Sequence, residues 1–486
     1  MLNYTGHPLV DVGIATIAAF AGKRDPSTLT ETDLDLIADY MEHNYAIDPL
    51  KSFLTVAFQN SGFTQSAYNA QPEKRQLYAD RVLRAYRADA PTQDALCVFT
   101  GAPAAAIRFD VKGQLEPGRA FRQHIPLLTS VDAINFFPYG DKGLLVSGVA
   151  LLAIQALPLG CAKARGRLLA VHCDDPNLMY EFASGFLQQN RRSVLTAQKA
   201  GESKLPEYPH WAGTTIISTL LDLEEKKADK ENERQPVSIT AYHFSSGQSV
   251  GLKLYHVPLE IAAFLRAAMS ARYVTVWKAL CERGWEVTRE RVARKGEVFS
   301  PRYNILYEDL FSLPDGAAKF VRRYFLRVPD RRPSLHGDPG ASYSVRQDVE
   351  LVSWNLTALF LRKVVNMNPN RIDQIRKLGD ALAEYVSGEN DRRFFQSFLM
   401  VSKYGPMRAL LIRASVARIK QGRPPLVAFD PYMEVFEEGE DLPNADWRLA
   451  RDLVLIRMIE QLYQLGWLQA HAEEIPEPTV EEETTA

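Results

Sequence analysis

GRLLAVHCDDPNLMYEFASGFLQQNRRSVL, residues 166–195, places a strand directly before a helix. Its first part is a short apolar run closed by an Asp-Asp-Pro turn, which predicts a buried strand. The second part, residues 178–195, predicts a helix. His172 and Cys173 are neighbours in the strand, so their side chains should point to opposite faces of a sheet. The stretch therefore predicts a mixed α+β fold for this half of the chain.

The segments on either side extend this pattern. Residues 25–45 and 72–89 predict amphipathic helices, and residues 144–157 predict a buried helix. Residues 95–135 contain only short apolar runs, which predict short strands and irregular loops. Residues 239–258 are two β-rich arms around a Ser-Ser-Gly-Gln-Ser tip and predict a hairpin.

The C-terminal part of the sequence predicts helices alone. Residues 329–342 are rich in Pro, Gly and Ser and predict a linker. Asn368 and Pro369 suit the N-cap and first position of a helix. We therefore expect an α+β domain of mixed helices, short strands and a β-hairpin over residues 1–335, followed by an all-α helical bundle over residues 343–470.

Composition excludes several classes of protein. The chain has 486 residues, of which 46% are hydrophobic and 24% charged, as in an ordinary globular protein. Four cysteines argue against a disulfide framework and for a reducing compartment. The N-terminus does not resemble a signal peptide, and the most apolar run, residues 144–159, is too short to cross a bilayer. We expect a cytoplasmic protein without membrane contact.

Charge is segregated along the chain although the net charge is only −2. Lys and Arg exceed Asp and Glu over residues 266–332 and 346–423, whereas acidic residues dominate from residue 430 onward. The last residues, 471–486, are acidic and poor in apolar side chains, which predicts a disordered tail. Two basic blocks before an acidic end suit a protein that holds a polyanion along its body.

Arginines of the two basic blocks are candidate contacts to a nucleic-acid backbone, because the guanidinium group is planar and always charged. Aromatic residues are interleaved with them. The alternative is that these residues form solvated helix faces. The candidates are Arg322, Arg323, Arg371, Arg376, Lys377, Arg392, Arg393, Arg408 and Arg413.

Enzyme signatures are scarce. No P-loop, G-x-S-x-G or H-E-x-x-H motif occurs. A metal-dependent nuclease that uses Asp174 or Asp175 with Glu224 is an alternative, but Asp-Asp-Pro is ordinary turn chemistry and Glu224 belongs to a charge run. We expect a protein that is not an enzyme and that carries no cofactor.

Three stretches resemble the large subunit of type I (I-B-like) CRISPR surveillance complexes, known as Cascade. They are YTGHPLVDVGIATIAAFAGKRDPSTLTETDL near the N-terminus, residues 134–183 and the hairpin segment AYHFSSGQSVGLKLYHVP. The subfamily is named for two C-x-x-C motifs that bind one structural zinc. Here Cys97 and Cys161 remain, but Thr100 and Ala164 replace the second cysteines. The resemblance therefore predicts a degenerate zinc-finger-like region over residues 95–175 without metal.

The resemblance also implies a role and partners. The large subunit binds the guide RNA end, neighbouring backbone, guide-end-capping and small subunits, and target double-stranded DNA. It recognises the protospacer-adjacent motif, supports R-loop formation, holds the displaced strand and docks a helicase-nuclease or a transposition adaptor, while base pairing supplies sequence specificity. Polar loop residues are the candidate motif readers. These candidates are Asn135, Tyr139, Lys142, Ser246, Gln248, Arg119, Arg122 and Gln123.

A pure assembly scaffold, which binds protein partners but no DNA, is a further alternative. The motif that is read, and whether the system degrades DNA or directs transposition, stay open at this point.

Overall fold

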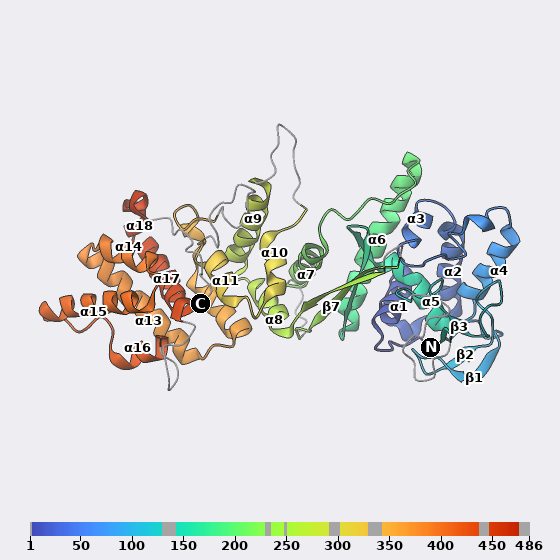
Figure 1. Ribbon diagram of the computed structural model, residues 1–486, viewed down its shortest axis with the longest axis horizontal. Coiled ribbons are helices and arrows are strands. Elements are labelled where there is room, and N and C mark those ends of the chain that lie inside the picture. Colours follow the sequence, from blue (N-terminus) through green and yellow to red (C-terminus); the bar gives the residue numbers. More distant parts are fainter. Residues whose placement is uncertain are drawn as a thin grey trace. The chain divides into compact units, whose positions relative to one another are not determined.

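The computed structural model describes most of the chain (Figure 1). The described residues are 2–128, 142–228, 235–246, 250–290, 302–328, 343–436 and 447–475. Contacts divide the chain into unit 1, residues 1–219 with 237–258, and unit 2, residues 220–236 with 259–486. Unit 1 mixes helices with short antiparallel strands, and the described part of unit 2 is helical, which confirms the predicted fold class. The predicted linker and domain boundary, residues 329–342, lie outside the described residues.

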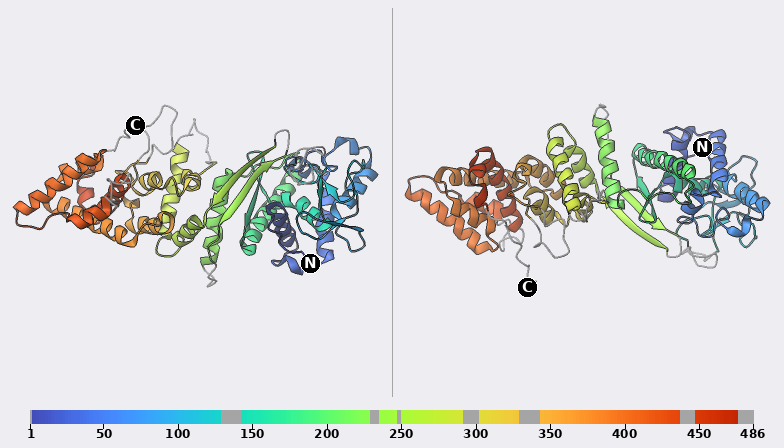
Figure 2. Two further views of the ribbon diagram at one scale, coloured as in Figure 1. Left: turned by 60° about the horizontal axis from the view of Figure 1, so that its bottom comes forward. Right: turned by 90° about the horizontal axis from the view of Figure 1, so that it is seen from above.

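The main sheet of unit 1 has four antiparallel strands in the order β5-β6-β7-β8. The strands are β5 (Ala162–Ala164), β6 (Arg167–Cys173), β7 (Ile239–Ser245) and β8 (Gly251–Val257). The predicted buried strand and hairpin are confirmed as β6 and as β7 with β8. His243 lies opposite both Leu169 and Lys253, so these three side chains share one face. β5 and β8 are the edge strands of the sheet (Figure 2).

Helix α1 (Pro8–Phe20) is the central helix of unit 1. It packs on α5 (Gly148–Ala156), α6 (Pro176–Ala200) and β6. A Cβ atom at Gly13 would lie 2.0 Å from the carbonyl oxygen of Ala153, so the approach of α1 to α5 requires a glycine there. All but one residue of α5 is buried, which confirms the predicted buried helix.

Three more α-helices and two pairs of short strands belong to the described part of unit 1. They are α2 (Glu31–Tyr45), α3 (Leu50–Leu54), α4 (Pro72–Leu83), β1 (Thr92–Leu96), β2 (Pro103–Ala105), β3 (Arg119–Ala120) and β4 (Leu144–Leu145). Thr30 and Asp33 form a reciprocal capping box at the start of α2. The strands pair as β1 with β2 and β3 with β4, which confirms the short strands predicted for this region.

Unit 2 is a stack of helices in its described part. α7 (Ala212–Ala228) begins in unit 1 and ends in unit 2. The helices that follow are α8 (Leu259–Ala268), α9 (Val274–Glu290), α10 (Ile305–Asp309), α11 (Ala317–Phe320), α12 (Trp354–Phe360), α13 (Pro369–Glu389), α14 (Arg392–Met400), α15 (Tyr404–Lys420), α16 (Phe429–Phe436), α17 (Trp447–Gln464) and α18 (Trp467–Ala470). Asn368 caps α13 as predicted, since its side chain accepts from the N–H of Asn370.

The core of unit 2 is aromatic around α8 and α12 and aliphatic along α17. Phe360 stacks on Phe320 and meets Phe264 edge to face. α17 buries eleven of its 18 residues and packs on α13, side by side with α16 (Figure 2). The predicted tail begins as ordered chain, because Arg346 donates to the carbonyl oxygens of Ala472 and Glu473; residues 476–486 lie outside the described residues. No described helix combines the length and the apolar character that a membrane span requires.

Candidate nucleic-acid interface

Five of the nine cations predicted to contact a nucleic-acid backbone are ion-paired or buried within the chain. Arg322 lies 3.3 Å from Asp452, and Arg376 and Lys377 both bind Asp373. Arg323 and Arg371 are only 5% and 7% exposed. Arg323 binds Asp309, and Arg371 donates to the carbonyl oxygen of Val435. Arg323 and Arg371 are therefore the least accessible of the nine candidates, because both side chains are buried within unit 2.

The other four predicted cations lie on two neighbouring helices. Arg392 and Arg393 begin α14, Arg408 and Arg413 lie on α15, and all four are exposed. α14 and α15 pack on each other. We call Arg393, Arg408 and Arg413, together with the exposed Lys403 between the helices, the α14–α15 cationic face.

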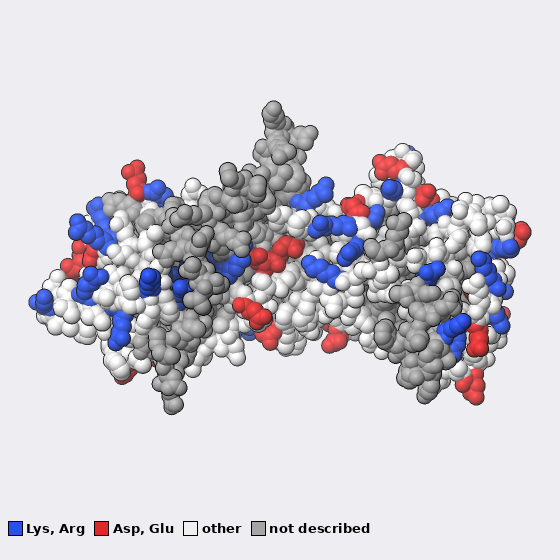
Figure 3. Space-filling model, viewed as in Figure 1, with Lys and Arg blue, Asp and Glu red and all other residues white. Residues whose placement is uncertain are grey.

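The four side chains of the α14–α15 cationic face form no ion pair with the residues that the structure describes, since no Asp or Glu carboxylate of those residues lies within 4 Å of them. α15 buries only Met407, Leu411 and Ala414, so most of its circumference is open to solvent. Figure 3 shows Lys and Arg side chains spread over the part of unit 2 that holds these helices. An uncompensated cationic surface attracts polyanions and binds them with strong salt dependence.

Described residues at the ends of the three segments predicted to read the flanking motif are linked by contacts in unit 1. Arg119 Nη1 lies 3.4 Å from the carbonyl oxygen of Lys142, because β3 pairs with β4. The hydroxyl of Ser246, at the end of β7, accepts from the N–H of Leu127, a few residues after Gln123. The structure thus joins segments that are up to 120 residues apart in the sequence.

Not every predicted motif reader is accessible. Ser246 is 1% exposed, and its N–H donates to the carbonyl oxygen of Val56, so its place in this structure is a buried contact between the hairpin and the segment after α3. Arg122 and Gln123 are half-buried. Arg119 also lies 3.7 Å from Glu116. Asn135, Tyr139 and Gln248 lie outside the described residues.

The two cysteines of the degenerate motifs occupy different environments. Cys161 is fully buried and donates to the carbonyl oxygen of Leu157, and burial raises the pKa of its thiol. Burial also acts to raise the pKa of Cys97, but hydrogen bonds from Thr100, Ser147 and Phe99 outweigh it and leave that pKa below its usual value. Within the described ranges, no three His, Cys, Asp or Glu side chains are grouped in a way that could hold a metal ion.

The carboxylates of the nuclease alternative have other partners. Asp175 caps α6, because its Oδ1 accepts from the N–H groups of Asn177 and Leu178 at 2.9 and 3.1 Å. Glu224 lies 3.9 Å from Arg266. Both contacts are ordinary structural roles for acidic residues.

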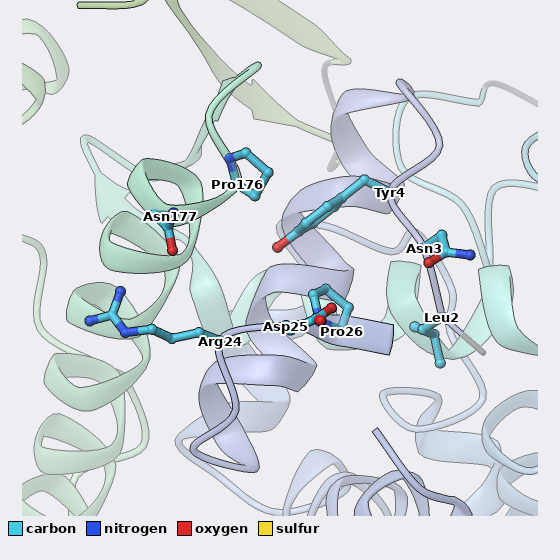
Figure 4. A pocket seen from close by; sticks show the side chains of 8 residues that line it. All are labelled: Leu2, Asn3, Tyr4, Arg24, Asp25, Pro26, Pro176 and Asn177. Atoms are coloured by element: carbon cyan, nitrogen blue, oxygen red, sulfur yellow. The ribbon is translucent and has the colours of Figure 1, made fainter. Parts of the chain in front are cut away.

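A pocket of about 330 Å³ lies beside the first helix of unit 1 (Figure 4). It is lined by Leu2, Asn3, Tyr4, Arg24, Asp25, Pro26, Pro176 and Asn177. The Tyr4 hydroxyl is buried and makes no hydrogen bond with any described residue. Arg24 binds Glu181 at 2.6 Å. The pocket contains none of the predicted site residues.

A second cationic group, which the sequence patterns do not predict, lies in unit 1. Arg165, Arg167 and Lys253 meet near Trp211 and Tyr255 on the main sheet of unit 1. The only local signal is the basic turn KARGR, residues 163–167. Lys253 and Trp211 are far from it in the sequence, so periodicity and composition could not join them.

The chain matches no protein-family model, and searches of curated proteins and of solved structures find no similar protein. The function must therefore be argued from the residues and their placement.

Proposed function

We propose that this chain is the non-catalytic large subunit of a type I Cascade complex. In that role it recognises the protospacer-adjacent motif on duplex DNA, supports R-loop formation and holds the displaced strand. The observation that carries the proposal is the α14–α15 cationic face, which lies within the helical part of the chain where the resemblance expects strand binding. Cations without carboxylate partners retain their full attraction for phosphate.

The arrangement of unit 1 supports the motif-reading part of the proposal. Arg119 and Lys142 lie side by side through the β3–β4 pair. Phosphate contacts of this kind set the register of a protein on duplex DNA, and neighbouring polar side chains then reach base edges. The guide RNA, backbone and guide-end-capping subunits, a small subunit, and a helicase-nuclease or transposition adaptor are the proposed partners. The proposed location is the cytoplasm.

DNA binding by the purified full chain tests the proposal. The variant Arg393→Gln/Arg408→Gln/Arg413→Gln removes three cations of the α14–α15 cationic face. The control Arg376→Gln/Lys377→Gln/Arg423→Gln removes one half-buried and two exposed cations that already bind Asp373 or Glu389. Affinity for a labelled single strand is measured by fluorescence anisotropy from 50 to about 300 mM salt.

The face variant should bind more weakly on every target sequence, and its plot of log affinity against log salt should be shallower by about 2. The control should change little. Equal behaviour of both variants would contradict the proposal and favour the scaffold. Cleavage that depends on a divalent ion and is abolished by Asp175→Ala would favour the nuclease.

A further inference from the structure

The turn between β5 and β6 places an arginine where a smaller residue is usual. Arg165 and Gly166 connect the strands as a two-residue loop, and both have left-handed backbone angles, with φ of 51° and 75°. Asn, Asp and Gly are the residues that such turns favour. Arg165 is exposed, and its guanidinium carbon lies 4.8 Å from the centroid of the Trp211 ring. This turn therefore presents a cation over an aromatic face.

Two further cations reach the same part of the sheet. Arg167 extends toward β8, where a Cβ atom at Gly251 would lie 3.1 Å from its Nη2. Lys253 Nζ lies 4.4 Å from the centroid of the Tyr255 ring. We call Arg165, Arg167, Lys253, Trp211 and Tyr255 the sheet patch.

His243 is near all three cations of the sheet patch, because each of them affects its pKa. It is 6% exposed, its ring lies 6.2 Å from the ring of Tyr255, and its Nε2 lies 2.8 Å from the carbonyl oxygen of Ala164. Burial lowers the pKa of His243, and all three cations of the sheet patch lower it further. The imidazole is therefore neutral at physiological pH and adds no charge of its own.

The three cations of the sheet patch form no ion pair with a carboxylate of any described residue, since no such carboxylate lies within 4 Å of the side chains of Arg165, Arg167 or Lys253. Glu207 is at the turn, but its oxygens bind the N–H of Gly166 at 3.0 Å and Lys163 Nζ at 3.2 Å. The sheet patch thus combines three cations with two aromatic rings, each ring in contact with one of the cations.

We propose that the sheet patch binds a single-stranded nucleic acid. Unpaired bases stack on aromatic side chains, and the phosphates between them bind neighbouring cations, which is the recognition that this combination suits. A duplex hides its base faces, and an acidic peptide has none, so neither would use Trp211 and Tyr255. The inference rests on the proposed function, because that function brings the chain into contact with single strands, either guide RNA or unwound DNA.

The test uses a substitution that removes the charge of Arg165 without disturbing the turn. The variant is Arg165→Asn/Arg167→Gln/Lys253→Gln, in which asparagine is a preferred residue for a left-handed turn position. The control Lys74→Gln/Lys112→Gln/Lys199→Gln removes three exposed lysines elsewhere in unit 1. Thermal unfolding of both variants first verifies the fold, because the turn substitution should not lower the melting temperature.

Binding of labelled 12-nucleotide RNA and DNA single strands to the full chain is then measured by fluorescence anisotropy. The patch variant should lose roughly tenfold or more in affinity for at least one of them, with a salt slope lower by about 2. The RNA and DNA arms identify which strand the site takes. Ultraviolet crosslinking of a bromouracil-containing strand should label Trp211 or Tyr255.

Unchanged affinity in both arms would overturn the inference and would point to an acidic protein as the occupant. The α14–α15 variant is measured on the same strands. If only that variant loses affinity, the proposed function stands and the sheet patch does not bind strands. If only the patch variant loses affinity, the sheet patch stands and the strand-holding role of α14–α15 fails.

Discussion

His172 Nε2, in β6, lies 3.4 Å from Oδ2 of Asp11, in α1. Asp11 is 2% exposed and also accepts from the N–H and hydroxyl of Thr5 and from the N–H of Gly6. The Asp11 carboxylate therefore links the N-terminal segment, helix α1 and the main sheet of unit 1. Burial acts to raise the pKa of Asp11, but these hydrogen bonds outweigh it and lower that pKa, so the group is charged at neutral pH.

Replacing this carboxylate should destabilise unit 1. Asp11→Asn puts an NH₂ group where an oxygen now accepts, and a buried donor is left facing other donors. We expect the free energy of unfolding to fall by about 2 kcal/mol, measured by urea denaturation. The control substitution Asp174→Asn, at an exposed position just after β6, should change the free energy of unfolding by less than about 0.5 kcal/mol. Similar values for the two would show that the Asp11 contacts contribute little.

A buried histidine should make stability depend on pH. His124 is fully buried, and burial lowers its pKa to about 3. The unfolded chain binds a proton at this residue near pH 6.5 and the folded chain does not, so stability is lost as the pH falls below 6.5. From pH 8 to pH 5 this residue should lower the free energy of unfolding by about 2 kcal/mol.

Two histidine variants separate this effect from the rest of the titration. The rings of Tyr78, Phe109 and Phe121 surround His124, so a phenylalanine suits this position. The variant His124→Phe should flatten the pH dependence of the free energy of unfolding between pH 8 and pH 5. His43→Gln, at an exposed position, should leave it as in the unmodified chain. Parallel pH curves for the two variants would contradict the assignment.

The degenerate cysteine motifs should not retain zinc. The thiolate, not the thiol, is the metal ligand, and burial keeps Cys161 protonated at neutral pH. Two thiolates would in any case leave a tetrahedral site half-filled. Mass spectrometry of the purified protein for metal content should give far less than one zinc ion per chain. One tightly held ion per chain would refute this prediction.

Two glycine-to-alanine changes should have opposite effects. Gly13→Ala forces a methyl group to within 2.0 Å of the Ala153 carbonyl oxygen and should cost about 3 kcal/mol of unfolding free energy. In α6, by contrast, a Cβ atom at Gly185 meets nothing within 4 Å. Gly185→Ala should therefore stabilise the chain by about 0.5 to 1 kcal/mol, because alanine is the better helix former. Thermal unfolding of the two variants measures both effects.

Local sequence was sufficient wherever a contact lies within a few residues. The capping box at Thr30, the N-cap at Asn368, the strand that ends at Cys173 and the hairpin of β7 with β8 were all predictable. Each depends on periodicity, on a turn or on a side chain that binds a backbone group two or three residues away. The α+β class of unit 1 and the helical character of unit 2 follow from the same patterns.

The tertiary structure alone decided which cations are available to a ligand. Arg371 and Arg408 look alike in sequence, yet Arg371 is buried against Val435 and Arg408 is exposed on α15. Lys253 likewise comes near Arg167 only because β6, β7 and β8 align in one sheet, and Trp211 contacts Arg165 from the segment before α7. Hydrophobic periodicity indicates which face of a helix or strand is buried, but not which distant residue packs against that face. Whether a cation is paired or exposed depends on that distant residue, so only the tertiary structure decides it.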